Sequence, residues 1–270
     1  MVHLRHVEFE YDGGRHAQGV AGAVGVSAGF RLSIENLVVE QGGRAACIGA
    51  SGTGKTTLVN LIAGILVPDA GTVYLGPIEM SELSDEQRRS IRVSMIGMVF
   101  QEFELLEYLS AGDNILLPYY IASARARAGI PRKYRGETPD GGPAGLLLTT
   151  EVRRRAARLA DEMRIGHLLK RKPSRLSQGE RQRVAICRAL VVEPQLVICD
   201  EPTGNLDPDT ARITLDMLFD QADRSGATLL MVTHNHGYLE RFNQTIDMAE
   251  LAGDMGTERV IAADREGDVS

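Results

Sequence analysis

Polar and apolar residues alternate in two segments near the start of the chain, LRHVEFEY at residues 4–11 and FRLSIENLVVE at residues 30–40. A period of two is typical of strands with one buried face. The segment between them, residues 13–29, is rich in glycine and alanine, and this composition predicts a loop or hairpin tip. The first part of the chain is therefore expected to contain two strands joined by a long connection.

Short apolar runs alternate with segments of helical length along most of the remaining chain. The apolar runs predict strands, and they are RAACIGA at 44–50, PDAGTVYL at 68–75, MIGMVFQ at 95–101, QLVICDEP at 195–202, ATLLMVTH at 227–234 and FNQTIDMAEL at 242–251. Helices are predicted at 55–66, 84–92, 181–194 and 209–226, the second of them from a capping box formed by Ser84 and Gln87. This alternation predicts an α/β fold with a parallel sheet covered on both faces.

The middle of the chain, from about residue 114 to 172, is helical and basic in character. Residues 149–169 are amphipathic, with Val152, Ala156, Leu159 and Met163 on one face. Glycine and proline at residues 127–145 predict an exposed loop. Between residues 125 and 172 there are 13 Lys and Arg against 5 Asp and Glu, while the rest of the chain has 17 basic and 31 acidic residues.

Composition narrows the class of protein. The 270 residues are 43% hydrophobic, enough for a sizeable core, and the net charge of −6 argues against a general nucleic-acid binder. No apolar run predicts a signal peptide or a membrane span. Cys47, Cys187 and Cys199 lie in apolar runs without a CxxC pair, which predicts buried reduced thiols.

The nine residues GASGTGKTT predict a phosphate-binding loop. They follow a predicted strand and precede a predicted helix, which is the context that G-x-x-x-x-G-K-[ST] requires. Glycines let successive backbone N–H groups point inward, and the helix N-terminus adds its positive dipole end. Lys55 is expected to reach the β- and γ-phosphates and Thr56 to bind Mg²⁺. The residues expected to bind the nucleotide here are Gly49, Ala50, Ser51, Gly52, Thr53, Gly54, Lys55, Thr56 and Thr57.

Two carboxylates, Asp200 and Glu201, end the apolar strand predicted at residues 195–202. Ligands bind at the carboxyl ends of strands in parallel sheets. Asp200 is then expected beside Mg²⁺, and Glu201 is expected to act as general base on a water molecule near the γ-phosphate. The alternative interpretation is that both carboxylates are solvated and only end the strand. The phosphate loop upstream makes this interpretation the weaker of the two.

A third motif gives the chain a family resemblance. LSQGERQRVAICRAL, residues 176–190, resembles the signature motif of ABC-type ATPases, and it precedes Asp200 and Glu201 as it does in that family. Ser177 and Gly179 open a helix whose free N–H groups can bind an anion. The resemblance implies that Ser177, Gln178, Gly179 and Glu180 bind the γ-phosphate of a nucleotide held by a second chain.

Four further positions resemble the family in its motif order. Gln101 is similar to the glutamine loop, which implies contacts with Mg²⁺, the attacking water and the transporter. Asp207 in GNLDP is similar to the D-loop that crosses the dimer interface. His234 is similar to the switch histidine that contacts the γ-phosphate. Tyr11 is similar to the aromatic residue that stacks on adenine, although its neighbour Phe9 or a buried sheet tyrosine remains an alternative reading.

The resemblance covers residues 2–250 and implies a nucleotide-binding core, an antiparallel β subdomain and a helical subdomain at about 102–176. An insertion is expected at about 125–150 and a tail at 251–270. Two copies are expected to form a homodimer around two ATP molecules. We further hypothesise that the basic insertion lies near anionic lipid or an acidic partner loop, and a solvated, mobile loop is the alternative.

EPTGNLD at residues 201–207 resembles the lipoprotein-release, macrolide-exporter and cell-division group of this family, as does the segment at 97–118. This resemblance implies an ATPase subunit that drives a membrane permease from the cytoplasmic face of the inner membrane. The long segment at 13–29, the insertion and the weakly patterned C-terminal end depart from the group. An importer ATPase is therefore the alternative, followed by an ABC protein without a transporter, which a single cassette without heptads disfavours.

Overall fold

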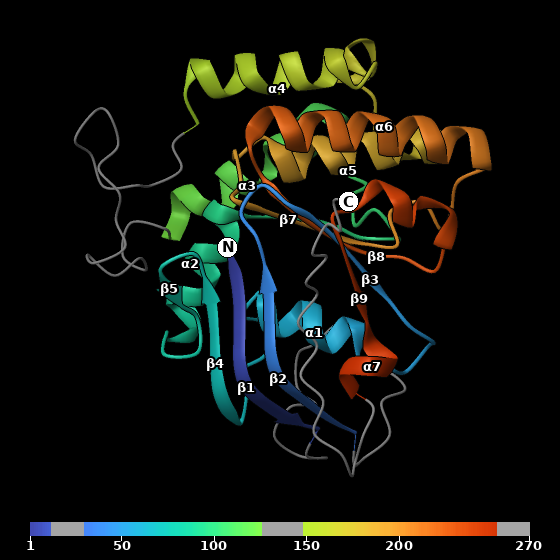
Figure 1. The fold of residues 1–270 in the computed structure, drawn as a ribbon. Helices are drawn as coiled ribbons and strands as arrows, with labels where there is room; N and C mark the ends of the chain where they lie inside the picture. Colours follow the sequence, from blue (N-terminus) through green and yellow to red (C-terminus); the bar gives the residue numbers. More distant parts are fainter. Residues whose placement is uncertain (12–29, 126–147, 253–270) are drawn as a thin grey trace, which may run out of the picture.

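The chain forms two sheets and the helices that cover them, as the computed structural model in Figure 1 shows. The structure describes residues 1–11, 30–125 and 148–252. The first sheet is antiparallel, with the order β2-β1-β4-β5. Its strands are β1 (Val2–Glu10), β2 (Arg31–Val39), β4 (Ala70–Leu75) and β5 (Ile78–Glu79). The two alternating segments that predicted strands are β1 and β2, which pair with each other from end to end except at His6.

The second sheet is parallel, with the order β6-β7-β8-β3-β9. Its strands are β3 (Arg44–Ile48), β6 (Ile96–Val99), β7 (Leu196–Asp200), β8 (Thr228–Val232) and β9 (Gln244–Asp247). Each of them lies in a segment whose apolar pattern predicts a strand, including the weakly patterned β9. The parallel α/β core is therefore confirmed, and so is the antiparallel subdomain that the family resemblance implies.

Most helices of the described residues lie where helices were predicted, with ends that differ by up to four residues, whereas α7 lies in a segment predicted as a strand. They are α1 (Lys55–Ile62), α2 (Asp85–Met95), α3 (Ala111–Arg125), α4 (Thr150–Glu162), α5 (Gln178–Leu190), α6 (Pro208–Ser225) and α7 (Met248–Ala252), with 3₁₀ turns η2 (Gly166–Leu168), η3 (Pro173–Arg175) and η4 (His236–Arg241). The α3 helix begins before the change in composition that was expected to mark it, and it contains Pro118. The segment at 242–251 is part strand and part helix, because β9 is followed directly by α7.

Side-chain caps fix where most of these helices begin. The predicted capping box of Ser84 and Gln87 is present at α2, and Ser177 and Glu180 form a second one at α5. Thr149 caps α4 and Asp207 caps α6. Such a cap satisfies backbone N–H groups that the helix itself leaves without a partner. The first helix differs, because Gly54 begins α1 with a left-handed backbone and no side-chain cap.

The parallel sheet separates two hydrophobic cores. Leu196 and Ile198 of β7 pack on one side with α1 and the antiparallel sheet, while Val197 and Cys199 pack on the other with α3, α4, α5 and α6. Both sides are buried, so this strand reads as a continuous apolar run rather than an alternating one. In Figure 1, α1 lies between the two sheets, and α5 and α6 lie across the other face of the parallel sheet.

Several smaller expectations can be compared with the structure. Val152, Ala156 and Met163 are buried, as predicted for the apolar face of α4, whereas Leu159 is only partly buried. The three cysteines are buried and free, as predicted. The segment at 13–29, most of the insertion at 125–150 and most of the tail at 251–270 lie outside the described residues. Among the described residues, no helix is long and apolar enough to cross a bilayer.

We predict that Gly97→Ala destabilises the fold, because β6 passes very close to α5 at this position. A Cβ at residue 97 would lie 2.4 Å from the carbonyl oxygen of Ala189, and the backbone of a packed helix cannot easily shift. Overpacking of this kind costs about 1–3 kcal/mol of unfolding free energy. Urea denaturation measures the loss. Gly43→Ala is the control, since its Cβ would lie 3.2 Å from the carbonyl oxygen of Glu40, and equal losses in the two variants would contradict the prediction.

Candidate nucleotide site

Three neighbouring strands deliver most of the predicted site residues to one edge of the parallel sheet. The loop after β3 is the predicted phosphate loop, β7 ends in Asp200 and Glu201, and β8 is followed by Thr233 and His234. These strands are adjacent in the order β7-β8-β3 and parallel, so their carboxyl ends meet at the same edge. This edge is where open α/β sheets bind their ligands.

The phosphate loop has the backbone that the sequence predicts for it. Gly49, Gly52 and Gly54 all have positive φ angles, of 146°, 83° and 96°. A Cβ on Gly52 would meet nothing within 4 Å, so the loop is open at this point. A Cβ on Gly49 would instead lie 2.8 Å from Oγ1 of Thr53. The loop is thus closed at its base and open above, a shape that leaves room for a phosphate group.

Lys55 lies inside this loop, and its side chain is largely buried. Its Nζ donates to the carbonyl oxygens of Gly49 and Ala50, at 2.7 and 2.8 Å. Oγ1 of Thr53 donates to the same carbonyl of Ala50 at 2.9 Å. The next residue, Thr56, is exposed, whereas Thr57 is buried. The hydroxyl of Thr56 is therefore accessible at the first turn of α1, while that of Thr57 faces the protein.

Glu201 is held in an unusual backbone conformation beside His234. Its φ angle is 45°, a left-handed value that is uncommon for a residue with a side chain. The amide of Glu201 donates to the carbonyl of Val232 in β8 at 3.0 Å, and its carbonyl accepts from the amide of Gly204 at 3.1 Å. Nε2 of His234 lies 2.7 Å from Oε1 of Glu201. Since an ionised carboxylate only accepts hydrogen bonds, Nε2 is the donor in this contact.

Asp200 lies in the field of the same charged groups. Burial raises the pKa of its carboxyl above the ordinary value, the Glu201 carboxylate raises it further, and Lys55 and His234 act in the opposite direction. Lys55, Asp200, Glu201 and His234 therefore form one interacting cluster. A carboxyl group with a perturbed pKa, such as Asp200, beside a cation and a histidine is typical of a catalytic site.

Tyr11 approaches the phosphate loop from the antiparallel sheet. Its hydroxyl lies 3.5 Å from Oγ1 of Thr57, and its amide donates to the carbonyl of Phe30 at 3.1 Å. Phe9, the alternative stacking ring, is fully buried and meets Tyr11 edge-on, with ring centroids 4.9 Å apart. A buried ring cannot offer a face to a base, so Tyr11 is the better placed of the two.

Phe30 is a neighbour of the loop that the sequence did not single out. A Cβ on Gly54 would lie 2.6 Å from its Cζ atom, and its ring centroid lies 6.1 Å from that of Tyr11. Phe30 thus packs directly on the turn that begins α1. The sequence gave no sign of this contact, because Phe30 and Gly54 are distant along the chain.

The signature residues contact α6 rather than the phosphate loop. Ser177 and Glu180 form the capping box of α5, and Gln178 is exposed. Gly179 is buried, and a Cβ there would lie 2.5 Å from Cγ2 of Thr210. Glycine therefore allows the first turn of α5 to pack closely against the first turn of α6.

Gln101 and Asp207 lie in segments that touch each other. The side chain of Gln101 packs against Gly204, where a Cβ would lie 2.9 Å from its Nε2, and its carbonyl accepts from Asn205 Nδ2 at 3.0 Å. Asp207 is exposed and accepts from the amide of Thr210 at 3.0 Å, and hydrogen bonds from Thr210 lower the pKa of its carboxyl. The structure therefore joins the predicted glutamine loop to the predicted D-loop.

Comparison with known proteins agrees with this geometry. The ABC transporter family matches residues 32–204, more than half of the chain. The chain belongs to the ABC transporter family. As a member it is an ABC-type ATPase, the nucleotide-binding subunit of a transporter, and the predicted family and fold class are confirmed.

Two named proteins and one solved structure illustrate which ABC proteins the chain is similar to. The chain is similar to the lipoprotein-releasing system ATP-binding protein LolD of Pseudomonas syringae, with 39% identity over 204 residues, 76% of this chain and 80% of that protein. It is 37% identical to LolD 1 of Rhodospirillum rubrum over 219 residues, 81% of this chain and 87% of that one. A solved ATP-binding cassette, MJ0796, described as a dimer in a post-hydrolysis state bound to ADP and Pi, has a TM-score of 0.68 at 28% identity, covering 92% of this chain and 94% of its own.

The residues of this ABC site fit a nucleotide with Mg²⁺. The α1 helix offers backbone N–H groups that no side chain caps, and the open loop at Gly52 leaves space above them. Such an N-terminus favours phosphate oxygens. Thr56 and Asp200 would supply oxygen ligands, the type that Mg²⁺ prefers, and Mg²⁺ commonly binds through one or two protein groups plus substrate phosphates.

We predict that Asp200→Asn stabilises the nucleotide-free chain. The raised pKa of Asp200 means that its charged form is less favourable in the folded chain than in the unfolded one. The charge therefore costs stability in full at pH values above the folded pKa, and this cost shrinks as the pH falls below the folded pKa and is absent below the unfolded pKa. At neutral pH the variant is expected to gain about 1 kcal/mol, or about 2–4 °C in Tm.

Thermal melts between about pH 4 and 8 test this prediction, because the gain should shrink toward the acid end. Asp220→Asn is the control, since Asp220 is an exposed residue of α6 paired with Arg224. Its effect should stay within about 0.5 kcal/mol. A destabilised Asp200→Asn variant, or a gain that does not depend on pH, would contradict the prediction.

Proposed function

We propose that this chain hydrolyses ATP as one of two identical subunits that drive a membrane permease of the lipoprotein-release type. The observation that carries the proposal is the cluster of Lys55, Asp200, Glu201 and His234 beside the uncapped N-terminus of α1. Relatives named as lipoprotein-releasing system ATP-binding proteins support the subgroup. An importer ATPase is the alternative, and an ABC protein without a transporter is a more distant one.

The residues of the cluster and those around it have proposed roles. Lys55 and the amides of residues 49–57 hold the phosphates, and Tyr11 stacks on the base. Thr56 and Asp200 hold Mg²⁺, which when bound neutralises charge that develops on the phosphate oxygens. Gln101 is proposed to complete this metal site from the loop that touches Gly204.

Glu201 is proposed as the general base, and His234 as the group that orients it. The 2.7 Å contact between them fixes the carboxylate, and the backbone bond from Glu201 to Val232 fixes its direction relative to β8. A base that is already oriented loses little entropy when it takes a proton from water. The family resemblance implies that His234 also contacts the γ-phosphate, and its side chain, 45% exposed, remains accessible for that contact.

A second copy of the chain is proposed to complete each site. Ser177 and Gln178 are exposed at the N-terminus of α5, and Glu180 is partly buried. Gly179 holds this end of α5 against α6. The resemblance implies that these four residues bind the γ-phosphate of the other copy, with Asp207 crossing the interface. The solved relative described as a dimer supports this arrangement.

The permease is proposed to dock near the loop that follows Gln101. Among the described residues, three of the four exposed large apolar side chains lie there or on α3, namely Tyr108, Tyr120 and Ile121. Tyr108 is 71% exposed. Asn114 of α3 is fully buried and fixes this loop, since its Oδ1 accepts from the amide of Leu106 at 2.8 Å. A rigid exposed aromatic is a typical anchor for a protein partner.

This function places the chain on the cytoplasmic face of the membrane, held there by the permease. The ATPase domain is proposed to span residues 2–250, with the helical subdomain at 102–176 and the tail at 251–270. Arg132, Lys133 and Arg135 of the basic insertion lie outside the described residues, so a role for them in membrane contact stays a hypothesis.

We predict that Glu201→Gln lowers the rate of ATP hydrolysis at least about 100-fold while ATP binding is retained. Glutamine keeps the shape and hydrogen bonds of the side chain but cannot accept a proton, and general bases contribute about 10²–10⁴-fold. Phosphate release and nucleotide titration measure the two effects. Glu240→Gln, the same chemical change at an exposed residue of η4, is the control. A Glu201→Gln variant with the wild-type rate would refute the assignment of the base.

The same variant identifies the partner, because it should hold ATP in the closed dimer. We expect membranes solubilised from the host with ATP and Mg²⁺ to yield a permease with few membrane helices and a large external domain. A permease with many helices and a separate binding protein would favour the importer, and ribosomal or DNA-repair proteins would refute the transporter.

We predict that adding Tyr108→Ser to this trap lowers recovery of the permease by about tenfold, because an anchor of this kind carries much of the binding energy. Ile213→Ser is the matched control, since Ile213 is an exposed apolar residue of α6, 37% accessible. Equal recovery in the two variants would place the docking site elsewhere.

A further inference from the structure

The segment that follows His234 is a closed turn rather than a loose loop. The amide of Asn235 donates to Oγ1 of Thr233 at 3.0 Å, and its side chain accepts from the amide of Gly237 at 2.9 Å, which caps η4. The amide of Thr233 in turn donates to the carbonyl of Cys47 in β3 at 3.1 Å. His234 and η4 are thus joined by hydrogen bonds that leave little freedom between them.

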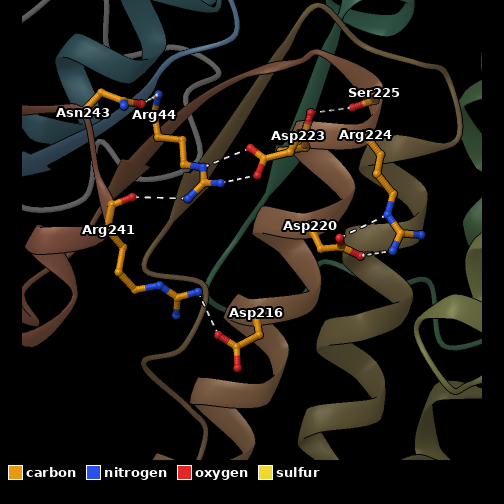
Figure 2. Close-up of polar contacts among 9 residues, drawn as sticks. Arg44, Asp216, Asp220, Asp223, Arg224, Ser225, Arg241 and Asn243 are labelled. Atoms are coloured by element: carbon orange, nitrogen blue, oxygen red, sulfur yellow. Dashed lines mark hydrogen bonds and ion pairs between the residues drawn. The ribbon is translucent and has the colours of Figure 1, made fainter.

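The far end of η4 is attached to α6 through Arg241 and through the next residue, Phe242, whose ring meets that of Phe219 edge-on with centroids 5.4 Å apart. Arg241, the last residue of η4, places Nη2 2.7 Å from Oδ1 of Asp216, as Figure 2 shows. Its guanidinium carbon lies 4.4 Å from the ring centroid of Phe219, one turn further along α6. Phe219 is 2% exposed, so the cation rests on a buried ring. An ion pair and a cation–π contact act together on the same guanidinium.

A second arginine reaches the same ring from β3. The guanidinium carbon of Arg44 lies 4.9 Å from the centroid of Phe219, and Arg44 forms two hydrogen bonds with the carboxylate of Asp223. Its Nη1 also donates to the carbonyl of Arg241 at 3.4 Å. Figure 2 shows Arg44 between Arg241 and Asp223. We call Arg44, Arg241, Asp216, Phe219 and Asp223 the arginine clamp.

The other end of α6 belongs to the proposed dimer interface. Asp207 caps the helix, and Thr210 in its first turn meets Gly179 of α5. From Asp207 to Asp216 the helix rises about 14 Å. One rigid helix therefore contacts the D-loop, the signature helix and the segment of His234.

We propose that Arg241, acting through the arginine clamp, is a positioning residue for His234 that links the histidine to α6. Arg241 touches no reacting group, and its effect passes through η4. The inference rests on the proposed function, because it takes His234 as the group that orients Glu201. When the clamp is intact, α6 and the histidine segment move as one body. When it is lost, the ring contact of Phe242 with Phe219 remains at the far end of η4. That end is then held less tightly, and His234 is less well placed against Glu201.

The chemistry of the clamp requires arginine rather than any cation. A guanidinium is planar, can lie flat on a ring and still offers N–H groups at its edge to a carboxylate. The side chain of Arg241 is 29% exposed, so solvent screens this pair less than one on the open surface. Arg224 and Asp220 on the same helix provide the comparison, with side chains 62% and 51% exposed. An exposed pair of that kind contributes little.

The test compares Arg241→Ala with Arg224→Ala in the purified full chain, using phosphate release from ATP with Mg²⁺. We expect Arg241→Ala to lower kcat about three- to tenfold, which lies within the range of about two- to thirtyfold for positions that couple two sites. KM for ATP and affinity for ADP should stay within about twofold, because the phosphate loop is untouched. Arg224→Ala should behave as wild type. Arg241→Lys, which keeps the charge without the planar contact, should have an intermediate kcat.

A second comparison separates positioning of His234 from general stability. In a His234→Ala background, Arg241→Ala should not lower the remaining rate further, because residues that act as one unit are not additive. Asp216→Asn removes the same ion pair without touching η4, and it serves as the second variant if Arg241→Ala folds poorly.

Three results would overturn the inference. The first is an Arg241→Ala rate equal to that of Arg224→Ala. The second is a parallel loss of kcat and nucleotide affinity. The third is the same further loss with and without His234. A wild-type chain that does not hydrolyse ATP, or does not need Glu201, would instead refute the proposed function, so the two failures are distinguishable.

Discussion

The site depends on holding two adjacent carboxylates, Asp200 and Glu201, at the end of a buried strand. Like charges repel, and burial disfavours the charged form of Asp200 further, which is why its pKa is raised. Two cationic or hydrogen-bonding groups oppose this effect, Lys55 from the loop after β3 and His234 from the segment after β8. The sheet order β7-β8-β3 is what brings these three loops together. The core of the protein is thus arranged so that an unfavourable pair of charges has its partners on neighbouring strands.

The same constraint explains the conformations around the pair. Glu201 adopts a positive φ angle, and a backbone bond to Val232 together with the turn closed by Gly204 keeps it there. Strain of this kind persists only where the surrounding structure determines it. The buried faces of β7 and β8 supply that support, because both strands are packed on two sides. Packing on both faces therefore has a functional consequence, since it fixes the direction in which the carboxylate leaves the sheet.

Much of this fold could be predicted from the sequence because its strands are short apolar runs and its helices begin at recognisable caps. The parallel strands, the capping boxes at Ser84 and Ser177 and the phosphate loop all follow from local pattern. The contacts that join distant segments could not be predicted from local pattern. Phe30 on Gly54 and the stacking of Arg44 and Arg241 on Phe219 depend on tertiary packing, and no local period encodes them. The roles assigned to single site residues rest on motif resemblance and stay predictions.

The N-termini of α1 and α5, which the proposed function assigns to phosphate binding, differ in their side-chain caps. This difference sets the order in which the two ends bind phosphate. At α1 no side chain caps the first N–H groups, so an anion can bind there without displacing a partner. At α5, Ser177 accepts from the amide of Glu180 and the Glu180 carboxylate accepts from the amide of Ser177. At α5 two amides of the first turn are thus already bonded, and an approaching anion also meets the negative charge of Glu180. Under the proposed function, nucleotide therefore binds first at the phosphate loop, and contact with the second copy follows as the weaker event. That order suits a dimer that must open again after each turnover, because the contact that closes it is the one most easily lost.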